Sequence, residues 1–248
     1  MEFSEHMLVL QVGKFREADL WVRLLSPTRG VISAFAFGGS RSRRRFVGCL
    51  DILNEISVRV SSSGRGAYLA LQEGVLIRGL SRLRGDWPRF GLAVNCVRFL
   101  QSMDVGTDGA EQAHGLMLQT LRLLEEQAVV PRLLPLFFRA RLAFDQGYAL
   151  HAGNCGTCKR EILGEGGVFF LREGFLLCRQ CASSRRDQRQ IMGAETLRCI
   201  ENIRERQPEQ WCDIALSPQT MREFSSLMDG FIQYHVGIVW DRGRFIKQ

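Results

Sequence analysis

The fold of the second half of this chain depends on two cysteine pairs, Cys155-Gly156-Thr157-Cys158 and Cys178-Arg179-Gln180-Cys181. Nineteen residues separate the two pairs. A spacing of two residues lets both sulfurs of a pair turn toward one point, so the pairs together supply four soft thiolates in a tetrahedral set. Zinc prefers this coordination at a structural site. The pattern therefore predicts one Zn²⁺ bound by Cys155, Cys158, Cys178 and Cys181.

The segment between the pairs is consistent with such a site. Residues 166–171 and 175–178 read as short strands that turn at Arg172-Glu173-Gly174, which would carry the second pair back over the first. Four protein ligands leave no open position on the metal, so the zinc would hold structure and would not catalyse. Basic side chains nearby would offset the negative charge of the centre, namely Lys159, Arg160, Arg172 and Arg179.

Two other interpretations of the cysteine pairs stay open at this stage, a redox CxxC motif and a pair of disulfides. A redox motif usually comes alone, next to a βαβ unit. His151, four residues before Cys155, could also be a substitute ligand. The other four cysteines are expected to be reduced core residues of a protein in a reducing compartment, namely Cys49, Cys96, Cys199 and Cys212.

Composition limits the class of protein. The chain has 248 residues, a net charge of +7 and 46% apolar residues, which is enough for a sizeable core. Only three of its 33 basic residues are lysines, so arginine carries the positive charge; a bias in genomic base composition is an equally good reason for that. A basic chain of this kind most often meets nucleic acid or an acidic partner. Neither a membrane span nor a signal peptide is recognisable, so a cytoplasmic location is expected.

The first part of the chain reads as β-structure, because short apolar runs end at glycine, serine and proline turn signals. Five strands are predicted, at residues 7–12, 19–25, 31–37, 46–60 and 67–77. Five strands in so short a segment suit a small, partly open barrel of the OB type. An SH3-like barrel or a split sandwich would give nearly the same periodicity.

After Gly79 the pattern changes to helices. Helices are predicted at residues 88–103, 111–127, 131–147, 186–206 and 219–236. The predicted fold class is α+β, with an N-terminal five-stranded OB-like barrel followed by a helical domain that carries an inserted four-cysteine zinc module. The predicted boundaries are 1–80 for the barrel, 81–150 for the first helical part, 151–182 for the zinc module and 183–248 for the second helical part, which ends in a polar, basic tail.

A basic loop lies between two of the predicted strands, Gly38-Gly39-Ser40-Arg41-Ser42-Arg43-Arg44-Arg45-Phe46. On the rim of a barrel, such a loop can place guanidiniums on successive phosphates without reading bases. A solvated charged turn without a partner is the alternative. Phe15 and Trp21 could supply stacking, although aromatic residues in strands more often belong to the core. The candidate DNA-binding residues are Lys14, Arg16, Arg23, Arg41, Arg43, Arg44 and Arg45.

Motifs of several enzyme classes are missing from the sequence. It contains no GxxxxGK[ST] loop for ATP phosphates, no HExxH, no GxSxG, and no HxE before the cysteines. The four histidines are scattered and read as surface or packed residues. We therefore expect a protein that is not an enzyme.

Several of these segments together resemble the bacterial RecO family of recombination mediators. The resemblance begins at Gly13-Lys14-Phe15-Arg16-Glu17-Ala18-Asp19 and continues through Leu24-Leu25-Ser26-Pro27-Thr28-Arg29-Gly30. It includes the glycine–basic–serine loop at residues 38–43, Phe144-Asp145-Gln146-Gly147-Tyr148 before the cysteines, and the last helix at residues 231–237. It departs from the family at Leu50-Asp51-Ile52-Leu53 and in a basic C-terminal stretch reduced to Arg242, Arg244 and Lys247.

The resemblance implies an N-terminal OB domain, a helical body and a zinc module. It also implies binding of single- and double-stranded DNA, annealing of complementary strands coated with single-strand-binding protein (SSB) through the SSB C-terminal tail, and loading of RecA together with RecR. Annealing needs charge neutralisation and no nucleotide hydrolysis, which agrees with a basic chain that lacks an ATP loop. A zinc-ribbon transcription or RNA-binding factor and a thiol oxidoreductase are the alternatives.

Overall fold

The structure is a computed structural model and describes residues 2–63, 66, 68–148, 150–185 and 189–248. The chain divides into two compact units. The first contains residues 1–91 and 104–118, and the second contains residues 92–103 and 119–248. Among the residues that the structure describes, no helix is both long and apolar enough to cross a membrane.

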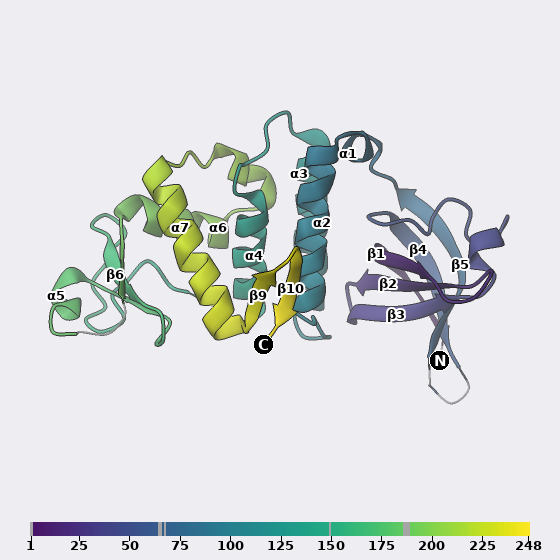
Figure 1. Cartoon of the computed structure of the whole chain (residues 1–248), viewed down its shortest axis with the longest axis horizontal. Coiled ribbons are helices and arrows are strands. Elements are labelled where there is room, and N and C mark those ends of the chain that lie inside the picture. The colour runs from purple at the N-terminus through teal and green to yellow at the C-terminus, as the bar shows by residue number, and fades with distance from the viewer. Residues whose placement is uncertain (1, 64–65, 67, 149, 186–188) are drawn as a thin grey trace. The chain divides into compact units, whose positions relative to one another are not determined.

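The first unit is built on a closed five-stranded barrel (Figure 1). Its strands are β1 (Glu2–Lys14), β2 (Leu20–Ser26), β3 (Gly30–Ala36), β4 (Glu55–Ser62) and β5 (Leu69–Arg78). They lie in the order β1-β2-β3-β5-β4, and β4 pairs with β1 to close the barrel. Only β3 and β5 are parallel, with Ala34 opposite Leu69 and Phe35 opposite Ala70. The predicted fold class, an α+β chain with an N-terminal OB-like barrel, is confirmed.

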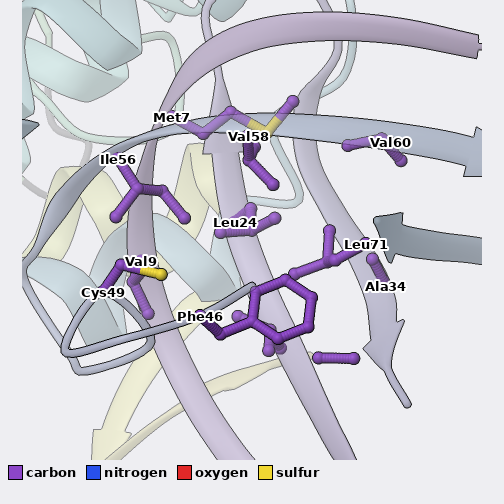
Figure 2. Close-up of a cluster of buried hydrophobic side chains, with 12 residues drawn as sticks. Met7, Val9, Leu24, Ala34, Phe46, Cys49, Ile56, Val58, Val60 and Leu71 are labelled. Carbon is purple, nitrogen blue, oxygen red and sulfur yellow. The ribbon is translucent and has the colours of Figure 1, made fainter. Parts of the chain in front are cut away.

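The barrel encloses a continuous apolar core. Alternate residues of the strands point inward, including Val22 and Leu24 on β2 and Val58 on β4, and all of them are buried. Phe46 and Cys49 complete the core, although neither lies on a strand. Figure 2 shows these two side chains among those of the strands.

The prediction of one long strand over residues 46–60 is wrong in its first half. Strand β4 begins only at Glu55, and residues 46–54 form turns. Their chain direction is set by Leu53, which has a positive φ of 67°, and by the side chain of Asn54, which donates hydrogen bonds to the carbonyls of Gly48 and Cys49 at 3.1 Å. The segment is apolar because it plugs the barrel, and apolar spacing alone does not distinguish a plug from a strand.

Three of the first four helices correspond to predicted helices, whereas the short first one was not predicted. The four are α1 (Ser81–Gly85), α2 (Trp87–Ser102), α3 (Ala110–Glu126) and α4 (Leu134–Asp145). Helix α4 begins three residues later than predicted, because residues 131–133 form a turn. Helix α4 has eight buried residues and serves as the centre of the second unit.

The second helical half contains α6 (Ala194–Glu205), a 3-10 segment (Pro208–Asp213) and α7 (Pro218–Phe231). The helix predicted over residues 186–206 is shorter, because Arg189–Met192 is strand β8 and residues 186–188 lie outside the described residues. A π-helical turn (Ile232–Val236) continues α7. The tail is a hairpin of β9 (Ile238–Asp241) and β10 (Arg244–Lys247) (Figure 1). The ring of Phe245 contacts that of Phe99 on α2 with centroids 5.2 Å apart.

Helices α6 and α7 cap each other's first turn. Glu195 of α6 accepts hydrogen bonds from the hydroxyls of Ser217 and Thr220 at 2.8 and 2.6 Å, and Glu223 of α7 accepts from the backbone N–H of Gly193 and the hydroxyl of Thr196 at 2.8 and 2.6 Å. The Thr220 hydroxyl is the largest cause of a lowered pKa for Glu195. Partial burial raises the pKa of Glu223, but its hydrogen bonds outweigh this effect and lower it. Both carboxylates are therefore stabilised as anions at helix N-termini.

Candidate functional site

The four cysteines of the two pairs form one cluster. Their Sγ atoms all lie within 4.8 Å of one another, and those of Cys158 and Cys178 are 3.9 Å apart. Tetrahedral zinc with Zn–S bonds of about 2.3 Å separates its sulfurs by roughly 3.8 Å. The cluster therefore has the dimensions of a four-thiolate metal site.

Short backbone contacts shape the first pair into a tight turn. The N–H of Lys159 donates to the carbonyl of Cys155 at 3.0 Å, and the N–H of Cys155 donates to the carbonyl of Arg160 at 2.8 Å. Lys159 has a positive φ of 61°, which reverses the chain directly after Cys158. Both sulfurs of the pair are thereby turned to the same side.

The second pair is presented by a small sheet. Strands β6 (Gly167–Phe170) and β7 (Phe175–Leu177) form a hairpin, β8 pairs with β6, and α5 (Arg179–Ala182) starts directly after β7. Cys178 is the N-cap of α5, and its sulfur accepts a hydrogen bond from the N–H of Cys181 at 3.4 Å. The N–H of Gly156 donates to the carbonyl of Leu176 at 2.8 Å, which fastens one pair to the other. The sequence predicted β6 and β7 but missed β8.

Two of the four sulfurs, those of Cys155 and Cys178, lie in surroundings that favour the thiolate. In contrast, hydrogen bonds with Cys178 and Cys158 raise the pKa of Cys181 to about 12. The N–H of Cys181 lowers the pKa of Cys178. Burial raises the pKa of Cys155, but backbone hydrogen bonds around it outweigh burial and lower this pKa to about 6. The carboxylate of Glu165, followed by Cys178, raises the pKa of Arg160. Arg160 is therefore one of the expected basic residues that interacts electrostatically with the cluster.

The remaining candidate ligands are engaged elsewhere. The Nδ1 atom of His151 lies 2.7 Å from the guanidinium of Arg204. All eight cysteines are free thiols. Cys96 and Cys199 are buried, and burial raises the pKa of each to about 12, which agrees with inert core thiols. The four clustered thiols are a closed ligand set with the chemistry that zinc prefers.

The second candidate site is the basic loop between β3 and β4, which is docked on the turn between β1 and β2. Asp19 of that turn accepts a hydrogen bond from the N–H of Gly38 at 2.7 Å. The carbonyl of Ala18 accepts from the N–H and the hydroxyl of Ser40 at 3.1 and 3.0 Å. Gly38 has a positive φ of 66°, a conformation that favours glycine. Two motifs about twenty residues apart in sequence thus form one local structure.

The four arginines of the loop have different surroundings. Arg41 pairs with Glu17 at 3.1 Å, but both side chains are mostly exposed, so this ion pair contributes little and leaves Arg41 available. Arg45 donates to the carbonyl of Phe37 at 2.5 Å and lies over the ring of Phe46. Arg43 and Arg44 are exposed and form no hydrogen bond or ion pair with any described residue.

The other three predicted residues lie on β1, β2 and the turn between them. Lys14 ends β1, and Arg16 lies in the turn with its guanidinium 5.3 Å from the ring centroid of Phe15. Arg23 lies in the middle of β2, is half-buried, and has a buried Nε atom without a hydrogen-bond partner among the described residues. Lys14 and Arg16 are therefore close to the loop in the structure, whereas Arg23 lies farther along its strand.

The two aromatic residues expected to stack have different surroundings. Trp21 packs over Gly13, where an added Cβ would lie 2.3 Å from the indole ring, so Trp21 serves the packing of the barrel wall. Phe15 is exposed and contacts Phe35 with ring centroids 4.7 Å apart. The sequence did not lead us to expect Phe37 and Tyr68, which lie beside Phe35, or Phe35 itself. The alternation of Phe35 and Phe37 along the chain was the available signal.

Comparisons with known proteins cover nearly the whole chain. Residues 1–80 match the sequence model of the family described as "Recombination protein O N terminal", and residues 84–244 match "Recombination protein O C terminal". The chain is 51% identical to the "DNA repair protein RecO" of Oleidesulfovibrio alaskensis over 246 residues, which is 99% of each chain. It is 49% identical to the protein of that name from Nitratidesulfovibrio vulgaris, over 99% of each chain, and 41% identical to that from Solidesulfovibrio magneticus, over all of both.

Proposed function

The chain belongs to the recombination protein O family and is a DNA repair and recombination protein, and we propose that it works by binding single- and double-stranded DNA and annealing complementary strands. The observation that carries this proposal is the docked basic loop. The side chains of Arg43 and Arg44 in this loop are exposed and form no hydrogen bond or ion pair with a described residue. The side chain of Arg41 forms an exposed ion pair. We assign Lys14, Arg16 and Arg23 to the same interface, in an OB domain of residues 1–80.

Annealing without an enzyme follows from the charges. Two DNA strands approach one another only when their phosphates are neutralised, and each phosphate contact releases counterions. A chain of net charge +7 with a row of arginines on one loop supplies this neutralisation. The step breaks no bond, so it needs neither a catalytic residue nor ATP. A nucleoid-associated place in the cytoplasm would follow from DNA as the ligand.

We propose one structural Zn²⁺ in the cysteine cluster, held by Cys155, Cys158, Cys178 and Cys181. A closed four-thiolate set has no position for water or substrate, so the metal would join the hairpin of β6 and β7 to the turn before it. The distances between the sulfurs and the backbone donor to Cys178 support this assignment.

Loading of RecA with RecR, on strands coated with SSB, is the wider role that we propose. The tail of SSB is acidic and ends in apolar residues, so it needs a cation beside an apolar pocket. An open pocket of about 620 Å³ in the second unit has this character, because Arg139 lies beside Trp240 and Phe245. Asp229, which lies 3.5 Å from Arg139, would have to release it partly.

A strand-annealing assay without ATP tests the proposal. Complementary oligonucleotides, bare or coated with SSB, should anneal faster with the protein than without it. The paired variant Arg43→Ala with Arg44→Ala should lose most of this acceleration. The proposal fails if the wild-type chain ignores bare oligonucleotides at low ionic strength. A preference for A-form RNA over single-stranded DNA would instead support an RNA-binding factor.

A further inference from the structure

Four aromatic rings meet on the outside of the barrel, and we name this group the aromatic platform. It consists of Phe15 after β1, Phe35 on β3, Phe37 after β3 and Tyr68 before β5. Phe35 is the central ring: its centroid lies 4.7 Å from that of Phe15, 6.0 Å from that of Phe37 and 5.9 Å from that of Tyr68. Phe37 and Tyr68 also contact each other, at 6.0 Å.

The platform faces away from the barrel core. Ala34 and Ala36 are buried in that core, and because side chains alternate along a strand, Phe35 points to the opposite face. Three of these residues are exposed, with Phe15 at 48%, Phe37 at 37% and Tyr68 at 44% of their full residue surface. Exposed aromatic residues in contact with one another are a sign of a binding surface rather than of packing.

Tertiary structure assembles the platform. The parallel pairing of β3 with β5 sets Phe35 opposite Ala70, which brings Tyr68 to the side of β3. The β1–β2 turn adds Phe15, whose N–H donates to the carbonyl of Asp19 at 2.9 Å. The rings therefore come from three segments that are fixed by barrel hydrogen bonds.

Cations lie next to two residues of the platform. The guanidinium of Arg16 lies 5.3 Å from the ring centroid of Phe15, and that of Arg45 donates to the carbonyl of Phe37. Lys14 is exposed at the end of β1, next to Phe15. Glu17 in the same turn forms an exposed ion pair with Arg41 at 3.1 Å. This surface matches a polyanion that carries flat apolar groups, which describes single-stranded DNA.

We propose that the aromatic platform stacks unpaired nucleobases of single-stranded DNA, while Lys14, Arg16 and Arg45 hold the adjoining phosphates. This inference rests on the proposed function and adds strand selectivity to it. Bases in a duplex already stack on their neighbours and present no free face, so the platform favours single strands. The basic loop, in contrast, contacts only phosphates and therefore binds both single-stranded and duplex DNA.

The test replaces aromatic side chains of the platform by leucine, which removes the ring but keeps an apolar side chain of similar size. A triple variant carries Phe15→Leu, Phe37→Leu and Tyr68→Leu, and Tyr68→Phe is the matched control because it keeps the ring. Equilibrium binding is measured with oligothymidylate, with an abasic oligomer of the same length, and with a duplex. Loss of a stacked base weakens binding about tenfold per ring. The triple variant should therefore bind oligothymidylate more weakly than the wild type does. Its affinity for the abasic oligomer and for the duplex should equal that of the wild type, and so should the salt dependence of binding.

Three outcomes overturn the inference. One is unchanged affinity of the triple variant for oligothymidylate. Another is an equal loss for all three probes, since this would report a damaged barrel. The third is a wild-type protein that binds the abasic oligomer as tightly as oligothymidylate, because base stacking would then add nothing. If the wild-type protein binds none of the probes, the proposed function fails together with this inference. The three outcomes above contradict the inference alone, so the two kinds of failure can be distinguished.

Discussion

The carboxylate of Asp19 accepts a hydrogen bond of 2.7 Å from the N–H of Gly38, and this contact fixes the start of the basic loop on the turn between β1 and β2. Gly38 can take its positive φ of 66° without a Cβ clash, so the loop leaves β3 in a defined direction. The arginines that follow are thereby held near Lys14 and Arg16 rather than on a free chain. The proposed DNA interface is therefore partly ordered before DNA arrives.

Replacing Asp19 by alanine should loosen the basic loop. A hydrogen bond to a charged group contributes about 1.5–3 kcal/mol, and its loss raises the population of open loop conformations. Trypsin should then cleave after Arg43 and Arg44 several-fold faster. Asp19→Asn is the control, because its amide oxygen still accepts the hydrogen bond from Gly38. Equal cleavage of wild type and Asp19→Ala would show that the contact does not order the loop.

Removing the unengaged arginines should change the salt dependence of single-strand binding. Each phosphate contact contributes roughly 0.7 to the slope of log affinity against log salt, so Arg43→Ala with Arg44→Ala should lower the slope by up to ~1.4. Arg59→Gln is the matched control, since Arg59 on β4 lies between the carboxylates of Glu2 and Glu73. A slope equal to that of the wild type would show that the basic loop does not contact the DNA phosphates.

Metal analysis of the purified protein should find about one zinc per chain. Cys178→Ser should abolish stoichiometric zinc and lower the melting temperature, while the serine hydroxyl can still cap α5, so the change reports on the metal. Cys212→Ser is the control, because this thiol lies outside the cluster and donates to the carbonyl of Val129. Chelator treatment of the wild type should reproduce the loss. A variant that keeps its zinc would exclude Cys178 as a ligand.

Acid should weaken the packing of α6 on α7. Glu195 and Glu223 both have folded-state pKa values below their usual 4.5, so their stabilising effect is complete above that pH and is lost as the pH falls through the lowered values. Glu195→Gln with Glu223→Gln should flatten the acid limb of unfolding stability against pH. Glu205→Gln, at the exposed end of α6, should leave it unchanged. An acid limb that is identical in all three proteins would contradict the reciprocal capping.

The plug of the barrel offers a stability test. Phe46 is 4% exposed and packs inside the barrel, so Phe46→Ala should destabilise the protein by about 3–5 kcal/mol in chemical unfolding. The neighbouring Val47 is 62% exposed, and Val47→Ala should change stability by less than about 0.5 kcal/mol. Equal effects of the two variants would mean that residues 46–54 do not close the core.

The cysteine cluster was predictable because metal ligands follow a local rule. Each CxxC pair turns its two sulfurs together within four residues, and two such pairs leave few ways to fold the segment between them. The strands β6 and β7 were recognised for the same reason. Strand β8 was missed because its partner β6 lies about twenty residues earlier and its own sequence, Arg189–Met192, has no strong alternation.

The sequence by itself indicated five N-terminal strands, the pairing of the four cysteines and the basic loop, because periodicity, cysteine spacing and charge are properties of neighbouring residues. Only the tertiary structure decided that residues 46–54 are a plug, that Asp19 holds Gly38, and that Tyr68 lies beside Phe35. These relationships join segments about twenty to thirty residues apart. They arise from strand pairing and from burial in a shared core, and neither of these can be recognised from a local sequence pattern.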